Sequence, residues 1–137
     1  MKNSKKIDMS NIDDVRNSLD KKSLRVCVVG IGRIGLPTAL SFAKAGLQTI
    51  GVDINEKLVD SINIGNFSSK DEPGQEELFN KVRKGGKFSA TTKIDDAVPQ
   101  SDLILLSLPT PMDENNIPDY TALRMVGNQL TKILEPK

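Results

Sequence analysis

Three glycines in the segment Gly-Ile-Gly-Arg-Ile-Gly, residues 30–35, have the spacing of a loop that binds a pyrophosphate. The segment follows an apolar, β-branched run at residues 24–29 and opens a helix-forming stretch. In that context Gly30 can make a tight turn, Gly32 can let the backbone approach a phosphate, and Gly35 can pack helix against strand. The helix N-terminus would add free N–H groups and positive potential. We predict a dinucleotide site here, although a purely structural turn is the alternative. The predicted cofactor contacts in this loop are Gly30, Ile31, Gly32, Arg33, Ile34 and Gly35.

A carboxylate follows the loop at the distance that a dinucleotide site requires. Asp53 comes after the apolar run Thr-Ile-Gly-Val, about 20 residues beyond the glycines, where the second strand should end. Its oxygens can accept hydrogen bonds from both ribose hydroxyls, and its charge would repel a 2′-phosphate, so NAD is favoured over NADP. The alternative is that Asp53 and Glu56 form a capping box for the next helix. We include the nearby Lys57 among the candidate cofactor contacts, although a lysine in a first helical turn is usually solvated.

A proline-rich loop at residues 107–111 follows another apolar run, Leu-Ile-Leu-Leu. In open α/β sheets, ligands bind beyond the carboxyl ends of the strands where the strand order reverses, and this loop would lie there. Two prolines fix an extended path that would hold the loop against the sugar and nicotinamide side of the cofactor, with Thr110 as a hydroxyl donor. A proline-stiffened surface turn is the alternative. The predicted contacts are Leu108, Pro109, Thr110 and Pro111.

Residues for covalent or acid-base chemistry are scarce. Histidine is absent, which excludes histidine bases, and the single cysteine supplies neither a disulfide nor a metal cluster. That residue, Cys27, lies within the first apolar run, where burial raises a thiol pKa and blocks access. Glu72, in Glu-Pro-Gly before a predicted helix, is a candidate on the substrate side, but it serves equally well as a helix-start device. We predict no catalytic residue and no metal site within this chain.

The predicted elements alternate between strand and helix. Strands are expected at residues 24–29, 48–53, 88–92 and 101–108, and helices at residues 36–45, 56–64, 75–84 and 119–134. With right-handed crossovers, this order predicts an α/β fold of the Rossmann type: a parallel sheet with helices on both faces and strand order 3-2-1-4. We expect the second half of that fold to be absent, because a fifth strand would be due after Pro136.

The chain divides into two regions that differ in composition, a polar leader and a predicted folded domain. Residues 1–22 form a polar leader, either disordered or containing a short helix at residues 11–20 that begins behind Ser10. Residues 23–137 are expected to form the dinucleotide-binding domain. This domain would be truncated, because we expect the second half of the Rossmann fold to be absent. Strand four would then expose an apolar edge, so we expect self-association.

The composition further limits the class of protein to which this chain can belong. With 137 residues the chain fits one domain, and 19 basic against 18 acidic residues give no sign of nucleic-acid or anionic-membrane binding. No apolar stretch approaches the roughly 20 residues of a membrane span, so the cytoplasm is the expected location.

Five short motifs, taken in order, resemble the UDP-glucose/GDP-mannose dehydrogenase family. They are Gly-Ile-Gly-Arg-Ile-Gly-Leu-Pro at 30–37, Gly-Val-Asp at 51–53, Glu-Pro-Gly at 72–74, Ala-Thr-Thr at 90–92 and Pro-Thr-Pro at 109–111. Within the family, Gly-Leu-Pro-Thr-Ala at 35–39 is most similar to the UDP-N-acetyl-D-mannosamine dehydrogenase branch, with UDP-glucose 6-dehydrogenase as an alternative. The resemblance implies an NAD-binding domain of an enzyme that oxidises a sugar C6 alcohol to a carboxylate, using two NAD and a cysteine in a later domain. It also implies that the nucleotide sugar binds through domains outside this chain.

Two positions depart from the family pattern. Arg33 stands where the family often has an aromatic residue, and Leu58 stands near a position that is often basic. Arg33 and the short length also fit a rival, a regulatory nucleotide-binding module of the potassium-transport type. The Glu-Pro-Gly and Pro-Thr-Pro segments are foreign to such modules and favour the dehydrogenase interpretation.

Overall fold

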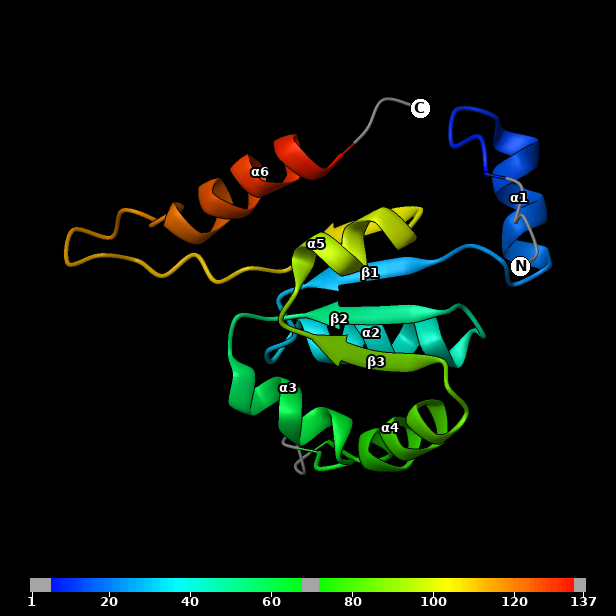
Figure 1. Ribbon diagram of the computed structural model, residues 1–137. Coiled ribbons are helices and arrows are strands. Elements are labelled where there is room, and N and C mark those ends of the chain that lie inside the picture. The colour runs from blue at the N-terminus through cyan, green and yellow to red at the C-terminus, as the bar shows by residue number, and fades with distance from the viewer. Residues whose placement is uncertain (1–5, 68–71, 135–137) are drawn as a thin grey trace.

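Four parallel strands form the centre of the molecule. The computed structural model describes residues 6–67 and 72–134. Its sheet runs in the order β3-β2-β1-β4, as predicted, with all three pairs parallel (Figure 1). In register, Val26 of β1 lies between Thr49 of β2 and Leu103 of β4. The strands are β1 (Val26–Val29), β2 (Thr49–Val52), β3 (Phe88–Thr91) and β4 (Leu103–Leu106).

Helices cover both faces of this sheet, which confirms the predicted architecture. They are α1 (Ile12–Asp20), α2 (Gly35–Lys44), α3 (Glu56–Asn63), α4 (Gln75–Lys84), α5 (Ile94–Ala97), the 3-10 turn η1 (Val98–Gln100) and α6 (Thr121–Ile133). Of these, α5 and η1 were not predicted from the sequence. The longest described helix is α6, with 13 residues, and no helix in residues 6–67 and 72–134 is long and apolar enough to cross a membrane.

Successive side chains of β1 point to opposite faces of the sheet, and the core accordingly consists of two clusters, one on each face. Val26 and Val28 point into a cluster formed with α2, α3 and α4, whereas Cys27 and Val29 point into a cluster formed with α5, η1 and α6. This two-sided burial explains why β1 has no polar position, because both faces of a central parallel strand are covered.

Two local expectations were wrong in detail. Helix α1 is capped by Asn11, whose side chain accepts from Asp13 N and Asp14 N, rather than by Ser10, whose own hydroxyl donates to Asp8. Helix α6 begins at Thr121, and Asp119 accepts from the Thr121 amide just before it. The apolar run of β4 is only partly buried, because β4 is an edge strand of the described sheet, as the sequence led us to expect.

Candidate cofactor site

A cleft of about 690 Å³ opens at the carboxyl ends of the strands, on the side toward which the arrows in Figure 1 point. Its walls come from the glycine loop, the end of β2, the segment after β3, the loop after β4 and one side of α6. These segments are far apart in the sequence, and the parallel sheet brings them together because all its strands end at the same edge. The lining residues include Gly30, Gly32, Gly35, Asp53, Asn55, Thr92, Leu108 and Gln129.

Two glycines of the loop are required by the fold itself. Gly30 has a φ of 92°, a conformation that L side chains rarely adopt, and a Cβ there would overlap the carbonyl oxygen of Ser107. A Cβ on Gly35 would overlap the carbonyl oxygen of Gly30. Close approach of loop, helix and β4 therefore explains the first and third glycines of the motif.

Gly32, the middle glycine, has no such structural reason. It is exposed, its φ is not positive, and apart from its two chain neighbours no described residue has an atom within 4 Å of the position that a Cβ would occupy. The open space at Gly32 borders the cleft. A group that approaches the backbone from the cleft would need this position to lack a side chain, and a pyrophosphate fits that requirement.

The loop also presents unused donors. Helix α2 begins at Gly35 with no side-chain cap, whereas α3 is capped by the Asn55 side chain, which accepts from Leu58 N at 3.2 Å. In the part of the chain that the structure describes, the amides of residues 32–35 have no hydrogen-bond acceptor. Free N–H groups at a helix N-terminus favour an anion, as the sequence predicted.

Asp53 is held in place by the backbone around it. Its Oδ2 accepts from Ile31 N at 3.1 Å and its Oδ1 accepts from Asn55 N at 2.9 Å. The carboxylate therefore ties the end of β2 to the glycine loop, and each oxygen keeps a lone pair for a further donor. The capping-box alternative is wrong, since Asn55 rather than Asp53 caps α3.

Four more of the predicted contacts line the cleft. Arg33 and Ile34 come from the glycine loop, and Leu108 and Pro109 come from the loop after β4. Ile34 is 73% exposed in this structure, which is unusual for so apolar a side chain next to a concave surface. Together with Gly30, Gly32, Gly35 and Asp53, these residues form one continuous site.

The remaining candidates do not line the cleft. Ile31 is fully buried against Gly51, so only its amide faces the site, through Asp53. Lys57, Thr110 and Pro111 are exposed and lie outside the lining. Glu72 is exposed in the turn that precedes α4 and is likewise not part of the cleft.

Sequence reasoning missed several apolar residues of the lining. Ile54, 96% exposed, directly follows Asp53, and Met125 and Val126 come from α6. The position of Ile54 next to the carboxylate was a usable signal. The contribution of α6 depends on how residues 107–120 return the chain to the sheet, which no local pattern specifies.

Cys27, the only cysteine of the chain, is unsuited to covalent chemistry. It is fully buried, and desolvation raises the pKa of its thiol to about 11, although a hydrogen bond with Ser101 partly opposes the shift. The thiol stays protonated at neutral pH and out of contact with solvent. This confirms that Cys27 lies buried within its strand.

Fold and site together define a dinucleotide-binding domain of the Rossmann type. Residues 24–137 match the model of the "UDP-glucose/GDP-mannose dehydrogenase family, NAD binding domain". The chain belongs to this family of NAD-dependent nucleotide-sugar dehydrogenases, and its cofactor is NAD. Membership decides against the potassium-transport module that the sequence had left open.

Relatives with known names support the same assignment. The chain is 38% identical over 112 residues to UDP-N-acetyl-D-mannosamine dehydrogenase of Campylobacter jejuni, covering 81% of this chain and 26% of that protein. It is 36% identical over 110 residues to the enzyme of that name from Escherichia coli K12, covering 80% and 25%. The chain thus spans about a quarter of the length of the curated relatives it matches.

Solved structures show the same fold. The UDP-N-acetyl-mannosamine dehydrogenase Cap5O of Staphylococcus aureus superposes with a TM-score of 0.71 at 33% identity, over 80% of this chain and 26% of that one. GDP-mannose dehydrogenase of Pseudomonas aeruginosa gives a TM-score of 0.71 at 33% identity, over 75% and 23%.

Proposed function

We propose that NAD binds in the cleft with its pyrophosphate on the amides of residues 32–35 and its adenine ribose on Asp53. The observation that carries this proposal is the open space at Gly32, the one glycine of the motif that the fold does not require. The free amides beside it supply donors, and the backbone-held Asp53 supplies an acceptor of fixed direction. Both groups are in place before the cofactor arrives, so little ordering is needed on binding.

The apolar residues around these polar groups complete the proposed site. Ile54 and Leu58 lie on one wall, and Met125 lies on the wall formed by α6. Ligand sites typically combine apolar walls with a few polar groups that fix orientation. In this proposal the walls hold the adenine, and the loop after β4 directs the nicotinamide toward the substrate. Bound NAD supplies the hydride acceptor, while the residues of this chain bind and orient it.

Calorimetric titration of the Gly32→Ala variant tests the proposed pose. A methyl group at Gly32 meets no atom of the described chain, so the fold should tolerate it while the approach of the pyrophosphate is blocked. We expect NAD and ADP-ribose to bind the unaltered chain alike, NADP more weakly, and Gly32→Ala to lose at least about tenfold in affinity, about 1.4 kcal/mol.

Gly127→Ala is the matched control, because a Cβ at Gly127 also meets no atom of the described residues and that residue does not line the cleft. It should bind NAD like the unaltered chain. Equal affinity of Gly32→Ala and Gly127→Ala would contradict the pose. Asp53→Ala is a weaker test, since it also removes the hydrogen bond to Ile31 N that holds the loop.

We further propose that the whole protein oxidises the C6 alcohol of UDP-N-acetyl-D-mannosamine to a carboxylate. The support is the agreement among relatives of that name, which align with this chain over 80–81% of its length. Catalytic residues for this reaction lie outside the present chain in this proposal, because Cys27 is buried with a raised pKa. The chain on its own is then expected to bind NAD without turning over a nucleotide sugar.

The substrate is tested with the full-length protein and three nucleotide sugars: UDP-N-acetyl-D-mannosamine, UDP-glucose and GDP-mannose. We expect NADH formation to be fastest with the first, with two NADH formed per sugar. Faster turnover of UDP-glucose would replace the substrate assignment by the UDP-glucose 6-dehydrogenase alternative and leave the cofactor pose untouched.

A further inference from the structure

Residues 111–119 form a rigid finger that projects from the domain between β4 and α6 (Figure 1). Asp113 N donates to the Ile117 carbonyl at 2.9 Å and Asp119 N donates to the Pro111 carbonyl at 2.7 Å. At the tip, Asp113 Oδ1 accepts from the amides of Asn115 and Ile117. The finger is therefore a hydrogen-bonded hairpin with a defined shape.

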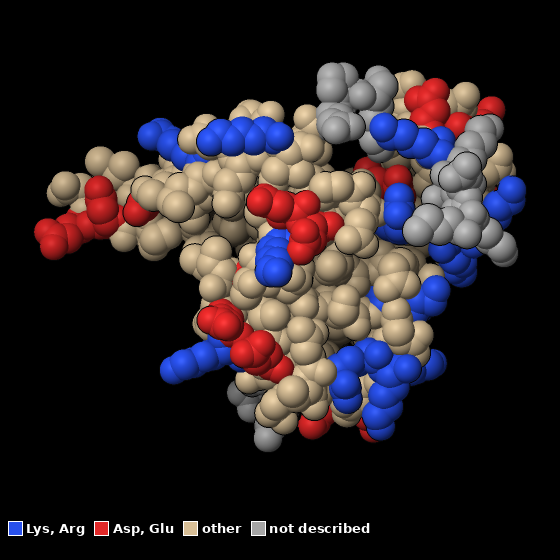
Figure 2. Space-filling model, in the orientation of Figure 1, with Lys and Arg blue, Asp and Glu red and all other residues tan. Residues whose placement is uncertain are grey.

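The finger combines negative charge with exposed apolar side chains. Met112 is 65% exposed and Ile117 is 58% exposed, and they flank the acidic tip formed by Asp113 and Glu114. Figure 2 shows acidic side chains at the end of the molecule where the finger projects, and basic side chains gathered at the opposite, lower side over α4. Large apolar side chains held on a rigid projection expose surface whose burial against a partner would be favourable.

A small groove of complementary character lies between α2 and α4. It has a volume of about 190 Å³, with Ala43, Leu78 and Val82 as its apolar floor and Lys44, Lys81 and Lys87 as its rim. No carboxylate lines it, and within the described residues none of the three lysines forms an ion pair. The volume suffices for one apolar side chain of the size of Met or Ile.

We propose that the finger of one copy docks into this lysine-rimmed groove of a second copy. An apolar side chain of the finger would enter the groove, and the carboxylates of Asp113 and Glu114 would face the lysines. Charge complementarity selects this occupant: the groove needs an apolar group next to negative charge, and the finger presents both. The proposal does not depend on the cofactor or on the substrate.

Finger and groove lie at different places on the surface, so the contact is heterologous. A chain that uses its finger on one neighbour keeps its groove free for another. We therefore expect association to continue beyond a dimer as the protein concentration rises. The contact is small and its charges are exposed, so the association should be weak and should weaken further at high salt. This route differs from the exposed edge of β4, through which self-association was predicted from the sequence.

Charge-reversal variants analysed by sedimentation velocity over a range of protein concentrations test the proposal. Glu114→Lys in the finger and Lys81→Glu in the groove should each raise the dissociation constant about tenfold, because an attraction is replaced by a repulsion. Mixing the two variants should restore much of the association, since each then offers a finger that matches the groove of the other. Asp60→Lys, an exposed carboxylate reversed on α3 outside both surfaces, is the matched control and should associate like the unaltered chain.

Several results would overturn the proposal. A chain that stays monomeric at all concentrations has no such contact. Association that persists unchanged in both single variants would come from another surface, such as the edge of β4. Loss of association in both variants without recovery on mixing would show that net charge, rather than pairing of finger and groove, controls it.

Discussion

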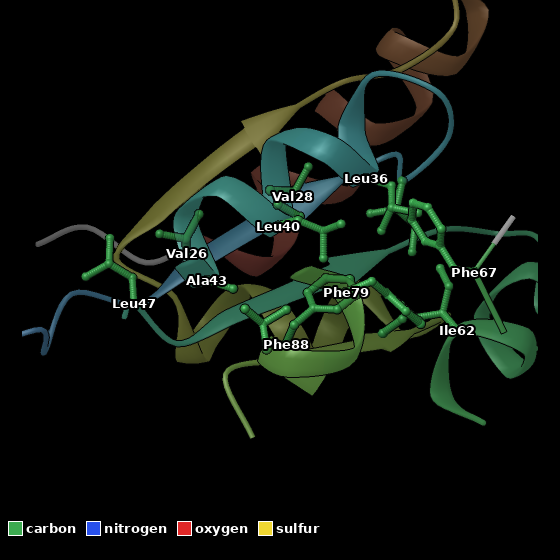
Figure 3. Close-up of a cluster of buried hydrophobic side chains, with 14 of the residues drawn as sticks. Val26, Val28, Leu36, Leu40, Ala43, Leu47, Ile62, Phe67, Phe79 and Phe88 are labelled. Atoms are coloured by element: carbon green, nitrogen blue, oxygen red, sulfur yellow. The ribbon is translucent and has the colours of Figure 1, made fainter. Parts of the chain in front are cut away.

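The two faces of the sheet are packed to different extents. Among the residues that the structure describes, the cluster formed with α2, α3 and α4 contains sixteen buried side chains, including Phe67, Phe79 and Phe88 (Figure 3). The cluster formed with α5, η1 and α6 contains seven of the described side chains, and Val126 is the one that α6 contributes to these seven. Packing density limits local opening, so the first face should be the more rigid one.

This difference divides the cofactor cleft into two halves. The glycine loop is anchored in the first cluster through Ile31, which is fully buried and packs beside Gly51 and Phe88. The opposite wall, from α6, rests on the smaller cluster. The glycine loop therefore rests on the larger cluster, and we expect the α6 wall to open more readily than the loop opposite it.

The largest expected difference between the faces is seen on removing one core side chain from each. Phe79 is fully buried, with its ring centroid 5.2 Å from that of Phe67 and 6.4 Å from that of Phe88. We expect Phe79→Ala to lower the free energy of unfolding by about 3–5 kcal/mol. Val126→Ala, in the other cluster, should lower it by about 1–2 kcal/mol.

Urea denaturation followed by circular dichroism measures both values. Phe79→Leu, which keeps more of the buried volume, guards against a variant that fails to fold. Equal losses for Phe79→Ala and Val126→Ala would remove the distinction between the faces.

The second cluster contains Cys27, and alkaline pH tests how well that cluster excludes water. The pKa of this thiol is raised from 9.0 to about 11 by desolvation, so the folded state keeps its proton where the unfolded state loses it. Stability is unaffected below pH 9 and falls as the pH rises to 11, by about 2–3 kcal/mol in total. The measurement is urea denaturation at a series of pH values.

Cys27→Val is the control for this experiment, because it removes the titrating group and keeps an apolar side chain of similar size. The difference in stability between the two proteins should grow between pH 9 and pH 11. A constant difference over this range would mean that water reaches the thiol and that this face is open.

The two edges of the sheet also differ, and we expect the edge at β3 to be better protected than the edge at β4. On the outer edge of β3, the Asn63 side chain donates to the Ala90 carbonyl at 2.8 Å and accepts from Ala90 N at 3.0 Å, as another strand would. Asn63→Leu removes both bonds and leaves the Ala90 amide without this partner, at a cost of about 1–2 kcal/mol. Thermal or urea unfolding measures it.

Asn128→Leu, on the exposed side of α6, is the control and should change stability by no more than about 0.5 kcal/mol. A similarly small effect of Asn63→Leu would show that water replaces the side-chain amide at this edge, so that the edge of β3 is no better protected than that of β4.

The sequence predicted more of the first face than of the second, for a physical reason. Helix α4 was predicted with its observed bounds, Gln75–Lys84, because charged residues and two glycines delimit an amphipathic stretch. The structural roles of Gly30 in the turn and of Gly35 in helix packing were predicted correctly, because steric contacts in the fold demand glycine there. The four-residue α5 was missed because it is too short to show a period. The α6 wall of the cleft was missed because long-range packing, and no local pattern, determines it.

The smallest expected effect concerns α6, the helix that forms one wall of the cleft. Gly127 lies inside α6, and beyond the adjacent turns of its own helix no described residue has an atom within 4 Å of the position that a Cβ would take. Gly127→Ala should therefore stabilise the helix by about 0.5–1 kcal/mol. Since α6 rests on the smaller cluster, we expect it to open separately from the rest of the domain. The gain should then be seen as slower amide hydrogen exchange within α6, while the global free energy of unfolding measured in urea hardly changes. An equal gain in global stability would mean that α6 unfolds together with the sheet, and the two faces would then differ in packing but not in cooperativity.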